Sequence, residues 1–283
     1  MQDLLGSPMP ATWQCEVHGS YDSAIDERRS PRFFCPTCDR THSLALKAWT
    51  DSWDLHRRWL ESKIPPRYRN RTFDNFRLTS SNEIPVSIAR RFVHHFADHL
   101  QEGTGLLLAG GLGTGKTHLA SAALTEIVRA GHDAAFISAA DFLAGLRPGS
   151  QCDDIDMEHL ASIDLLVMDD IGSTRATAWS SSVLSELLAS RYDGLRPTIV
   201  TTNSTDLAAH IGDRVVDRFD EMMLTAQLVG PSYRQRVADD NDLQGAPWAI
   251  PEPAREFESR RCSSGKLVTR KLRMGAHCPE PSR

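Results

Sequence analysis

Hydrophobic and polar positions recur along the chain with two spacings, and these predict most of the secondary structure. A helix is predicted from apolar residues four positions apart: Ile88, Phe92, Phe96 and Leu100. Further along, short apolar runs predict strands at 106–109, 134–138, 165–168 and 198–202. Helical stretches between them begin near Lys116, Asp141, Trp179 and Thr205.

The alternation of helices and strands over residues 83–238 predicts an α/β fold with a central parallel sheet covered by helices on both faces. Residues 1–62 are predicted to form a separate amino-terminal domain that ends in a tryptophan-rich helical pattern. The basic, proline-containing stretch 63–82 is interpreted as a linker. Residues 239–283 are polar and proline-rich with no apolar period, so we predict a mostly disordered tail.

Composition narrows the functional classes. The chain has 283 residues, a formal net charge of −5 and a pI near 6.1, which argues against a generally basic nucleic-acid-binding protein. No apolar run approaches membrane-spanning length, and Met1 to Pro10 lacks the pattern of an export signal. We therefore expect a cytoplasmic protein. Its six cysteines are then expected to be reduced thiols, some of them available for metal binding.

A glycine-rich loop follows the first predicted strand and precedes a helix. Its residues complete the pattern G-x-x-x-x-G-K-T: Gly110, Gly111, Leu112, Gly113, Thr114, Gly115, Lys116 and Thr117. Glycines let the backbone N–H groups turn inward around phosphate, the lysine reaches the β- and γ-phosphates, and the threonine hydroxyl binds Mg²⁺. The sequence therefore predicts an ATP site with Mg²⁺, and we count the following His118 among its contact residues.

Two later strands carry polar residues where a nucleotide site needs them. Asp169 and Asp170 end a buried strand, and ligands gather at the carboxyl ends of parallel strands. We expect Asp169 to anchor Mg²⁺ and Asp170 to polarise the attacking water. Asn203 ends the next strand and is the candidate sensor of the γ-phosphate. The alternatives are a solvated strand end for the acids and a turn former for the amide.

The loop, the Asp-Asp strand and the Thr-Thr-Asn strand together resemble an AAA+ ATPase. Within that superfamily, the runs 212–219 and 230–234 are similar to those of bacterial helicase loaders of the DnaC/DnaI type and of the related IstB transposition ATPases. The resemblance implies an ATPase that loads a replicative DNA helicase. It also implies that the amino-terminal region binds the helicase, that the ATPase domain binds single-stranded DNA, and that ATP acts as the switch.

The resemblance implies roles for three arginines. Arg218 is the implied arginine finger, which reaches the site of a neighbouring subunit, with Arg214 one helical turn earlier as its substitute. Arg234 is the implied second sensor. The alternatives are a surface pairing of Arg218 with Asp217, Asp220 or Glu221 and a loop salt bridge for Arg234.

Two features depart from the usual AAA+ pattern. The region after Arg234 shows no clear helical lid, and the acidic strand ends differently. Most members place Asp-Glu at the end of the acidic strand, where this chain has Asp-Asp, so its water-orienting carboxylate is one methylene shorter. We therefore expect ATP hydrolysis to be slow and stimulated by partners.

Cysteine and histidine pairs stand near the amino terminus. Cys15 and His18 form one pair and Cys35 and Cys38 another, a spacing that suits tetrahedral, structural Zn²⁺. Similar helicase loaders carry a comparable module. A redox dithiol at Cys35 and Cys38 and unliganded thiols are the alternatives, although no thioredoxin-like setting surrounds them.

The remaining alternatives concern partners. The tryptophan-rich helix either packs on the zinc module or docks to the helicase. The basic tail either contacts DNA electrostatically or is simply solvated. Rival functions are an IstB-like transposition helper, a zinc-ribbon adaptor that holds nucleotide without turnover and, more remotely, a small-molecule kinase.

Overall fold

The protein is described by a computed structural model that covers residues 10–15, 19–24, 36–147, 155–233, 257–261 and 267–271. The chain divides into two compact units, and each is described by itself. One unit comprises residues 1–54 and 252–283, and the other comprises residues 55–251.

The first unit contains two antiparallel strand pairs. β1 (Pro10–Cys15) pairs with β2 (Gly19–Ala24), and β8 (Phe257–Arg261) pairs with β9 (Leu267–Lys271). The second pair lies within the tail that the sequence predicts to be mostly disordered; for the tail as a whole this stays a prediction. The long helix α1 (Pro36–Glu61) begins in this unit and ends in the other.

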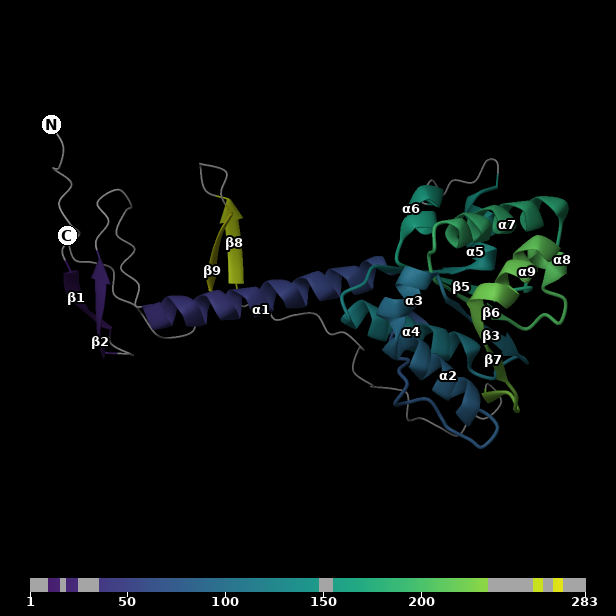
Figure 1. The fold of residues 1–283 in the computed structure, drawn as a ribbon, viewed down its shortest axis with the longest axis horizontal. Coiled ribbons are helices and arrows are strands. Elements are labelled where there is room, and N and C mark those ends of the chain that lie inside the picture. The colour runs from purple at the N-terminus through teal and green to yellow at the C-terminus, as the bar shows by residue number, and fades with distance from the viewer. Residues whose placement is uncertain are drawn as a thin grey trace. The chain divides into compact units, whose positions relative to one another are not determined.

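The second unit is an α/β domain (Figure 1). Its strands are β3 (Gly105–Gly110), β4 (Ala134–Ser138), β5 (Leu165–Ile171), β6 (Thr198–Thr202) and β7 (Met223–Leu228). Its helices after α1 are α2 (Glu83–His94), α3 (Phe96–Glu102), α4 (Lys116–Arg129), α5 (Ala139–Gly145), α6 (Met157–Ser162), α7 (Ala178–Asp193), α8 (Ala208–Ile211) and α9 (Asp213–Met222). A short 3₁₀ helix spans Pro66–Tyr68.

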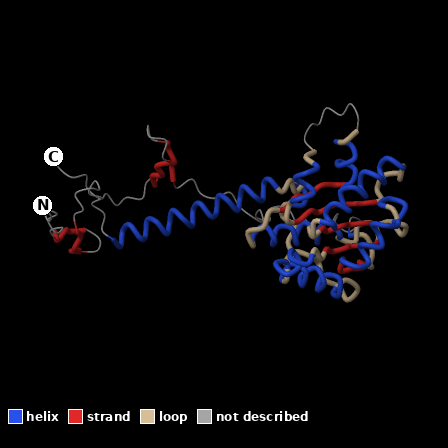
Figure 2. The backbone as a smooth tube through the Cα atoms, turned by 45° about the horizontal axis from the view of Figure 1, so that its top comes forward, coloured by secondary structure: helices blue, strands red, loops and turns tan. Residues whose placement is uncertain are grey.

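The five strands form one parallel sheet in the order β4-β5-β6-β3-β7. Helices cover both faces of this sheet (Figure 2). Alternate side chains of β5 show why both faces must be covered: Leu165 and Val167 join the core beneath α2 and α4, whereas Leu166 and Met168 join the core beneath α5 and α7. This confirms the predicted fold class, a parallel sheet between two layers of helices.

The predicted strands are confirmed within a few residues, but three elements differ. The single helix expected over residues 88–100 is broken at His95, where the backbone leaves helical angles between α2 and α3. The break keeps Phe92 and Phe96 in edge-to-face contact in the core, with ring centroids 5.9 Å apart. The sequence also missed the short α6 and the edge strand β7, which follows α9 without a turn residue.

The segment predicted as a linker is packed into the domain. Ile64, Phe73 and Phe76 are buried in the same hydrophobic core as α4 and β3. Trp59, near the end of α1, is only 2 % exposed and belongs to that core as well. Neither expected role of the tryptophan helix therefore accounts for Trp59, which packs in the core of this α/β domain.

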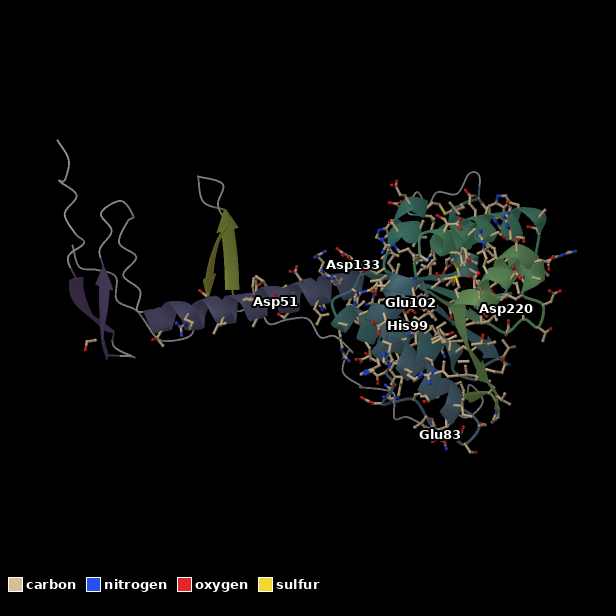
Figure 3. The ribbon with its side chains drawn as sticks, in the orientation of Figure 1. Asp51, Glu83, His99, Glu102, Asp133 and Asp220 are labelled. Atoms are coloured by element: carbon tan, nitrogen blue, oxygen red, sulfur yellow. The ribbon has the colours of Figure 1, made fainter. Side chains whose placement is uncertain are left out.

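Charged residues occupy the periphery of this domain. Figure 3 shows Glu83 at the start of α2 and Asp220 on the outer side of α9. Exceptions among the described residues include Lys116, Asp169 and Arg191, which are buried; Arg191 on α7 is completely so. None of the helices in the described part of the chain is long and apolar enough to cross a membrane.

The predicted zinc ligands lie mostly beyond what the structure describes. His18 and Cys35 are outside the described residues, and so are the side chains of Cys15 and Cys38. Within the described residues, no group of three or more His, Cys, Asp or Glu is placed to hold a metal ion.

Candidate nucleotide-binding site

The glycine loop connects β3, an interior strand of the sheet, to α4, as predicted. Gly115 caps α4 with a φ of +100°, a left-handed conformation that favours glycine. A Cβ atom at this position would lie 2.7 Å from the ring of Phe76, so the former linker presses directly on the loop. The loop conformation therefore depends on glycine for both its angles and its contacts.

Lys116 lies across the loop it terminates. Its side chain is largely buried, and Nζ donates hydrogen bonds to the carbonyl oxygens of Gly110 at 2.9 Å and Gly111 at 2.8 Å. These carbonyls hold the ammonium group at the mouth of the loop. A bound phosphate chain would meet a positive charge already in position.

Asp169 joins the acidic strand to the loop. Its Oδ2 accepts a hydrogen bond from the Thr117 hydroxyl at 3.3 Å, and its Oδ1 accepts one from the Thr201 hydroxyl at 2.7 Å. The predicted Mg²⁺ ligands Thr117 and Asp169 are thus adjacent, although 52 residues separate them in sequence. A hydroxyl and a carboxylate are hard oxygen donors of the kind Mg²⁺ prefers, so this pair fits the ion.

Burial raises the pKa of the Asp169 carboxyl. The hydrogen bonds from Thr201 and Thr117 oppose this shift, as does the charge of Lys116, while neighbouring Asp170 adds to it. A buried carboxylate whose negative charge is poorly solvated gains more from a divalent cation than an exposed one does.

Asp170 has a different environment from its neighbour. Its φ of +60° is unusual for a residue with a side chain, and the β5–β6 register shifts between Met168 and Ile171. Its backbone N–H donates to the Thr201 hydroxyl at 2.8 Å, which fixes this bulge. Asp170 is half-buried, whereas Asp169 is only 8 % exposed. The bulge thus leaves the two carboxylates in different environments, which is compatible with the separate roles predicted for them.

Strand β6, which precedes Asn203, lies between β3 and β5 in the sheet. Asn203 therefore follows the strand that separates the phosphate loop from the acids, and it is half-buried. This placement is compatible with a sensor of the γ-phosphate, a role that stays a prediction.

The segment just before Arg234 also contacts the glycine loop. The backbone N–H of Tyr233 donates to the carbonyl of Gly113 at 2.9 Å. The Tyr233 hydroxyl in turn accepts a hydrogen bond from Asn82 Nδ2 at 3.1 Å. Arg234 is outside the described residues, but the residue directly before it is tied to the phosphate loop.

His118 points toward the former linker. Its Nε2 lies 2.8 Å from the carbonyl oxygen of Thr72, and its ring meets Phe76 edge-on at 5.0 Å. Burial lowers the pKa of His118 to about 4; the bond to Thr72 opposes this shift and the charge of Arg71 adds to it. The ring thus joins the start of α4 to the segment before α2, and its nucleotide contact stays a prediction.

The lowered pKa of His118 predicts acid sensitivity. An unfolded histidine binds a proton near pH 6.5, whereas the folded one binds it only near 4. Stability is therefore complete above pH 6.5 and falls as the pH decreases toward 4, by about 3 kcal/mol from this residue. Urea unfolding at pH 7.5 and 4.5 should show a smaller loss for His118→Gln than for the wild type. Equal losses would contradict this.

The two candidate arginines of α9 differ in their surroundings. Arg218 forms an ion pair with Asp193 at 3.3 Å and lies 4.5 Å above the ring of Tyr192. Its partner is thus on α7, not among the three acids of α9 that the sequence suggested. Arg214 is exposed one turn earlier, on the same helix, as its spacing predicted.

Sequence reasoning missed two supporting residues. Thr201 bonds both the Asp169 carboxylate and the Asp170 backbone, and Tyr233 holds the loop backbone. The signal for Thr201 was present: it is a polar residue in a fully buried strand, and such a residue needs a partner. Nothing in the spacing of Tyr233 indicated its contact.

Comparison with known proteins identifies the family. The IstB-like ATP binding protein family matches residues 47–238, more than half of the chain and all of the site just described. The chain belongs to the IstB-like ATP-binding protein family. The match begins within α1 and includes the segment 63–82, in agreement with the packing of that segment on the domain.

Among relatives of this IstB-like protein are helicase loaders. It is 28 % identical over 203 residues to "Replicative helicase loader DnaC" of Escherichia coli (strain K12), which covers 69 % of this chain and 82 % of that one. The DnaC of Buchnera aphidicola subsp. Acyrthosiphon pisum is 27 % identical over 187 residues, which covers 62 % and 74 % of the respective chains.

Solved structures agree in fold. A crystal structure of the DnaC helicase loader aligns with a TM-score of 0.53 at 31 % identity and covers 58 % of this IstB-like protein and 100 % of that chain. A crystal structure of DnaI aligns with a TM-score of 0.51 at 21 % identity over 60 % of this chain and 94 % of its own. The second likeness concerns the fold alone.

Proposed function

We propose that this protein is an ATP-dependent loader of a replicative DNA helicase. The observation that carries the proposal is the likeness to the DnaC structure, which is aligned over its entire length at 31 % identity. The nucleotide site described above supplies the switch. The amino-terminal region would hold the helicase, and the ATPase domain would hold single-stranded DNA.

Each residue of the site has its own role in the binding and hydrolysis of ATP. Lys116 neutralises the β- and γ-phosphates, while Thr117 and Asp169 would hold Mg²⁺, which neutralises charge on the transferred phosphoryl group. Asp170 accepts a proton from the attacking water, and Asn203 orients that water or the γ-phosphate. Loss of the γ-phosphate removes the contacts that favour one arrangement of subunits, and helicase and DNA are released.

Arg218 would complete this site on a neighbouring subunit, with Arg234 contacting phosphate within its own subunit. In the single chain Arg218 rests on Asp193 and Tyr192, so assembly would exchange this pair for the γ-phosphate of the neighbour.

The rate of ATP hydrolysis by the Arg218→Ala variant should be roughly 10³-fold lower than that of the wild type. Mixing Arg218→Ala with Lys116→Ala subunits should restore part of the activity, because each supplies what the other lacks. Asp193→Asn is the matched control and should retain activity. If the mixture stays inactive while the variants still assemble, Arg218 does not act in trans.

We further propose that Cys15, His18, Cys35 and Cys38 bind structural zinc. The proposal rests on the spacing of the two ligand pairs. Elemental analysis of the purified full chain should find about one zinc per chain, and Cys35→Ser should lose it while Cys152→Ser should keep it. A full chain without zinc under reducing conditions would refute this.

The loading function is tested by assembly. Native mass spectrometry of the full chain with the host's replicative helicase should show a complex that forms with ATP and dissociates when single-stranded DNA and hydrolysis are both allowed. A helicase that never associates with this protein would contradict the proposal.

The family match also favours a second candidate, an IstB-like transposition helper. The two functions differ in partner rather than in nucleotide chemistry. A pull-down that recovers the cognate transposase but not the helicase would decide for the helper.

A further inference from the structure

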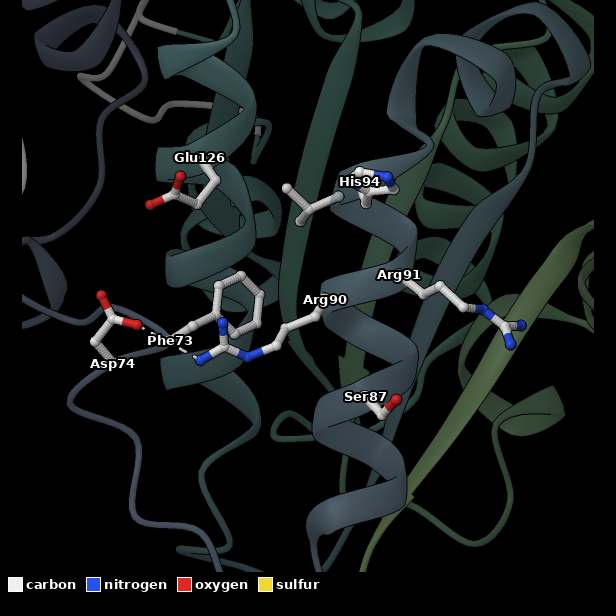
Figure 4. Close-up of a pocket in the computed structure, with 8 residues that line it drawn as sticks. Phe73, Asp74, Ser87, Arg90, Arg91, His94 and Glu126 are labelled. Atoms are coloured by element: carbon white, nitrogen blue, oxygen red, sulfur yellow. Dashed lines mark ion pairs between the residues drawn. The ribbon is translucent and has the colours of Figure 1, made fainter.

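A pocket of about 550 Å³ lies on the surface between α2, α4 and the segment 63–82 (Figure 4). Arg90 Nη2 lies 3.6 Å from Asp74 Oδ1, so these two charges of the lining are paired. Arg91 is directed to the opposite side of α2. The described lining of this pocket therefore concentrates charge of neither sign.

A buried hydroxyl between β5 and β6 is placed more specifically. Thr201, on β6, is 1 % exposed, and its hydroxyl donates to Asp169 Oδ1 at 2.7 Å. The same oxygen accepts the backbone N–H of Asp170 at 2.8 Å. A hydroxyl has one proton to donate and lone pairs that accept, so the bond to Asp169 leaves a lone pair for Asp170. Thr201 therefore links the predicted magnesium ligand to the residue predicted to polarise water.

These two bonds lie where the pairing of the strands is interrupted. The register of β5 against β6 shifts between Met168 and Ile171. Asp169 and Asp170 both bond to Thr201 within this interruption, and Asp170 adopts a φ of +60°. A left-handed conformation at a residue with a side chain persists only where its surroundings hold it. The hydrogen bond from the Asp170 N–H to Thr201 supplies such a hold.

The next residue of β6 makes a similar bridge. Thr202 is 2 % exposed, and its hydroxyl donates to the carbonyl oxygen of Ile171 at 2.6 Å. It also accepts the backbone N–H of Ser204 at 3.0 Å. Two buried threonine hydroxyls thus close the bulge of β5 on the strand that precedes Asn203.

We infer that Thr201 is a positioning residue for ATP hydrolysis. It holds Asp170 in its left-handed conformation and so directs the carboxylate that accepts a proton from the attacking water. The bond to Asp169 sets the direction of the hydroxyl. The inference rests on the proposed function, in which Asp170 activates water. Because its hydrogen bonds go to the two acids, Thr201 acts through Asp170 rather than on the nucleotide itself.

The test exchanges the hydroxyl at nearly constant size. Thr201→Val replaces the hydroxyl by a methyl group, whereas Thr201→Ser keeps the hydroxyl. Phosphate release by the full chain is measured over a range of ATP concentrations at saturating Mg²⁺, with DNA and helicase present. Thr201→Val should lower kcat by about 10–100-fold and change KM for ATP by less than about threefold. The kcat of Thr201→Ser should stay within about threefold of the wild type.

Thr125→Val is the matched control. Thr125 lies on α4 in the same domain and is also 1 % exposed. Its hydroxyl has no hydrogen-bond partner in the described part of the chain. The same exchange of hydroxyl for methyl should therefore leave kcat and KM as in the wild type.

A double variant separates positioning from general damage to the site. Asp170→Asn removes the carboxylate that Thr201 directs, so adding Thr201→Val to it should lower kcat further by less than about twofold. If the two losses multiply instead, Thr201 acts by another route and the inference is overturned.

Calorimetric titration with ATP shows which variants are folded. A Thr201→Val variant that binds and hydrolyses ATP like the wild type overturns the inference and leaves the proposed function intact. Equal losses in Thr201→Val and Thr201→Ser also overturn it. If Thr201→Val does not fold, Thr201→Ala is compared with Thr201→Ser, and equal rates in these two overturn the inference. Wild-type hydrolysis by Asp170→Asn overturns both the inference and the role of Asp170 in the proposed function.

Discussion

Lys116→Ala should strongly reduce ATP hydrolysis and weaken ATP binding by at least about tenfold, because in the proposed site its ammonium group is the cation of the chain nearest to the phosphates. The phosphates would then face loop amides and no cation from the chain. We expect phosphate release to fall by roughly 10²–10³-fold. Steady-state phosphate release with DNA and helicase present measures the first effect, and titration with a fluorescent ATP analogue measures the second.

Lys47→Ala is the matched control, since this lysine is exposed on α1. It should behave as the wild type in both assays. Retention of ATP binding by Lys116→Ala would mean that the nucleotide lies elsewhere. Absence of hydrolysis in the wild type, despite tight ATP binding, would favour the adaptor that holds nucleotide without turnover.

Arg191→Ala should destabilise the ATPase domain by about 4 kcal/mol, although this residue is remote from the sequence motifs. Arg191 is completely buried on α7. Its guanidinium donates to the carbonyl oxygens of Leu160 at 2.6 Å, Ile163 at 3.0 Å and Pro197 at 2.5 Å. Alanine would leave these acceptors buried without donors and would open a cavity.

Burial lowers the pKa of Arg191 to about 9, with the charge of Arg196 adding to the shift and that of Asp164 opposing it. The side chain is therefore still charged at neutral pH and donates from every nitrogen. Arg191→Lys keeps a charge but not the planar fork, so we expect a smaller loss of about 2 kcal/mol. Urea unfolding checks both values. A loss below about 1 kcal/mol for Arg191→Ala would contradict the role assigned to these bonds.

The predictable part of the fold is the part in which local pattern and tertiary structure agree. The buried strands β3 to β6 are short apolar runs bounded by polar residues, and such runs have few other ways to fold. β7 follows α9 with no turn between them, and its pairing with β3 is decided by contacts distant in sequence. The linker was misinterpreted because Phe73 and Phe76 stand alone in a basic stretch, where two phenyl rings have no periodicity.

The predictable part of the site is the part that chemistry restricts to few residue types. Only glycine adopts the loop angles easily, and only a lysine and two acids suit the phosphates and the metal ion. The residues that hold the loop and Arg218 in place can be of more residue types. Tyr233 contributes a backbone N–H, which any residue except proline could offer, and Asp193 is one of many acids that could pair with Arg218. Such contacts depend on how helices and strands pack against one another. The spacing of residues in the sequence therefore does not reveal them.

The central claim is that Mg²⁺ and ATP bind together where the loop of β3 meets Asp169. Calorimetric titration of the full chain with ATP in the presence of Mg²⁺ tests it most directly, with Asp169→Asn and an excess of chelator as comparisons. We predict one binding site per chain, with affinity reduced at least about tenfold by either the substitution or the chelator. No heat of binding to the wild type, or equal affinity in all three titrations, would contradict the claim.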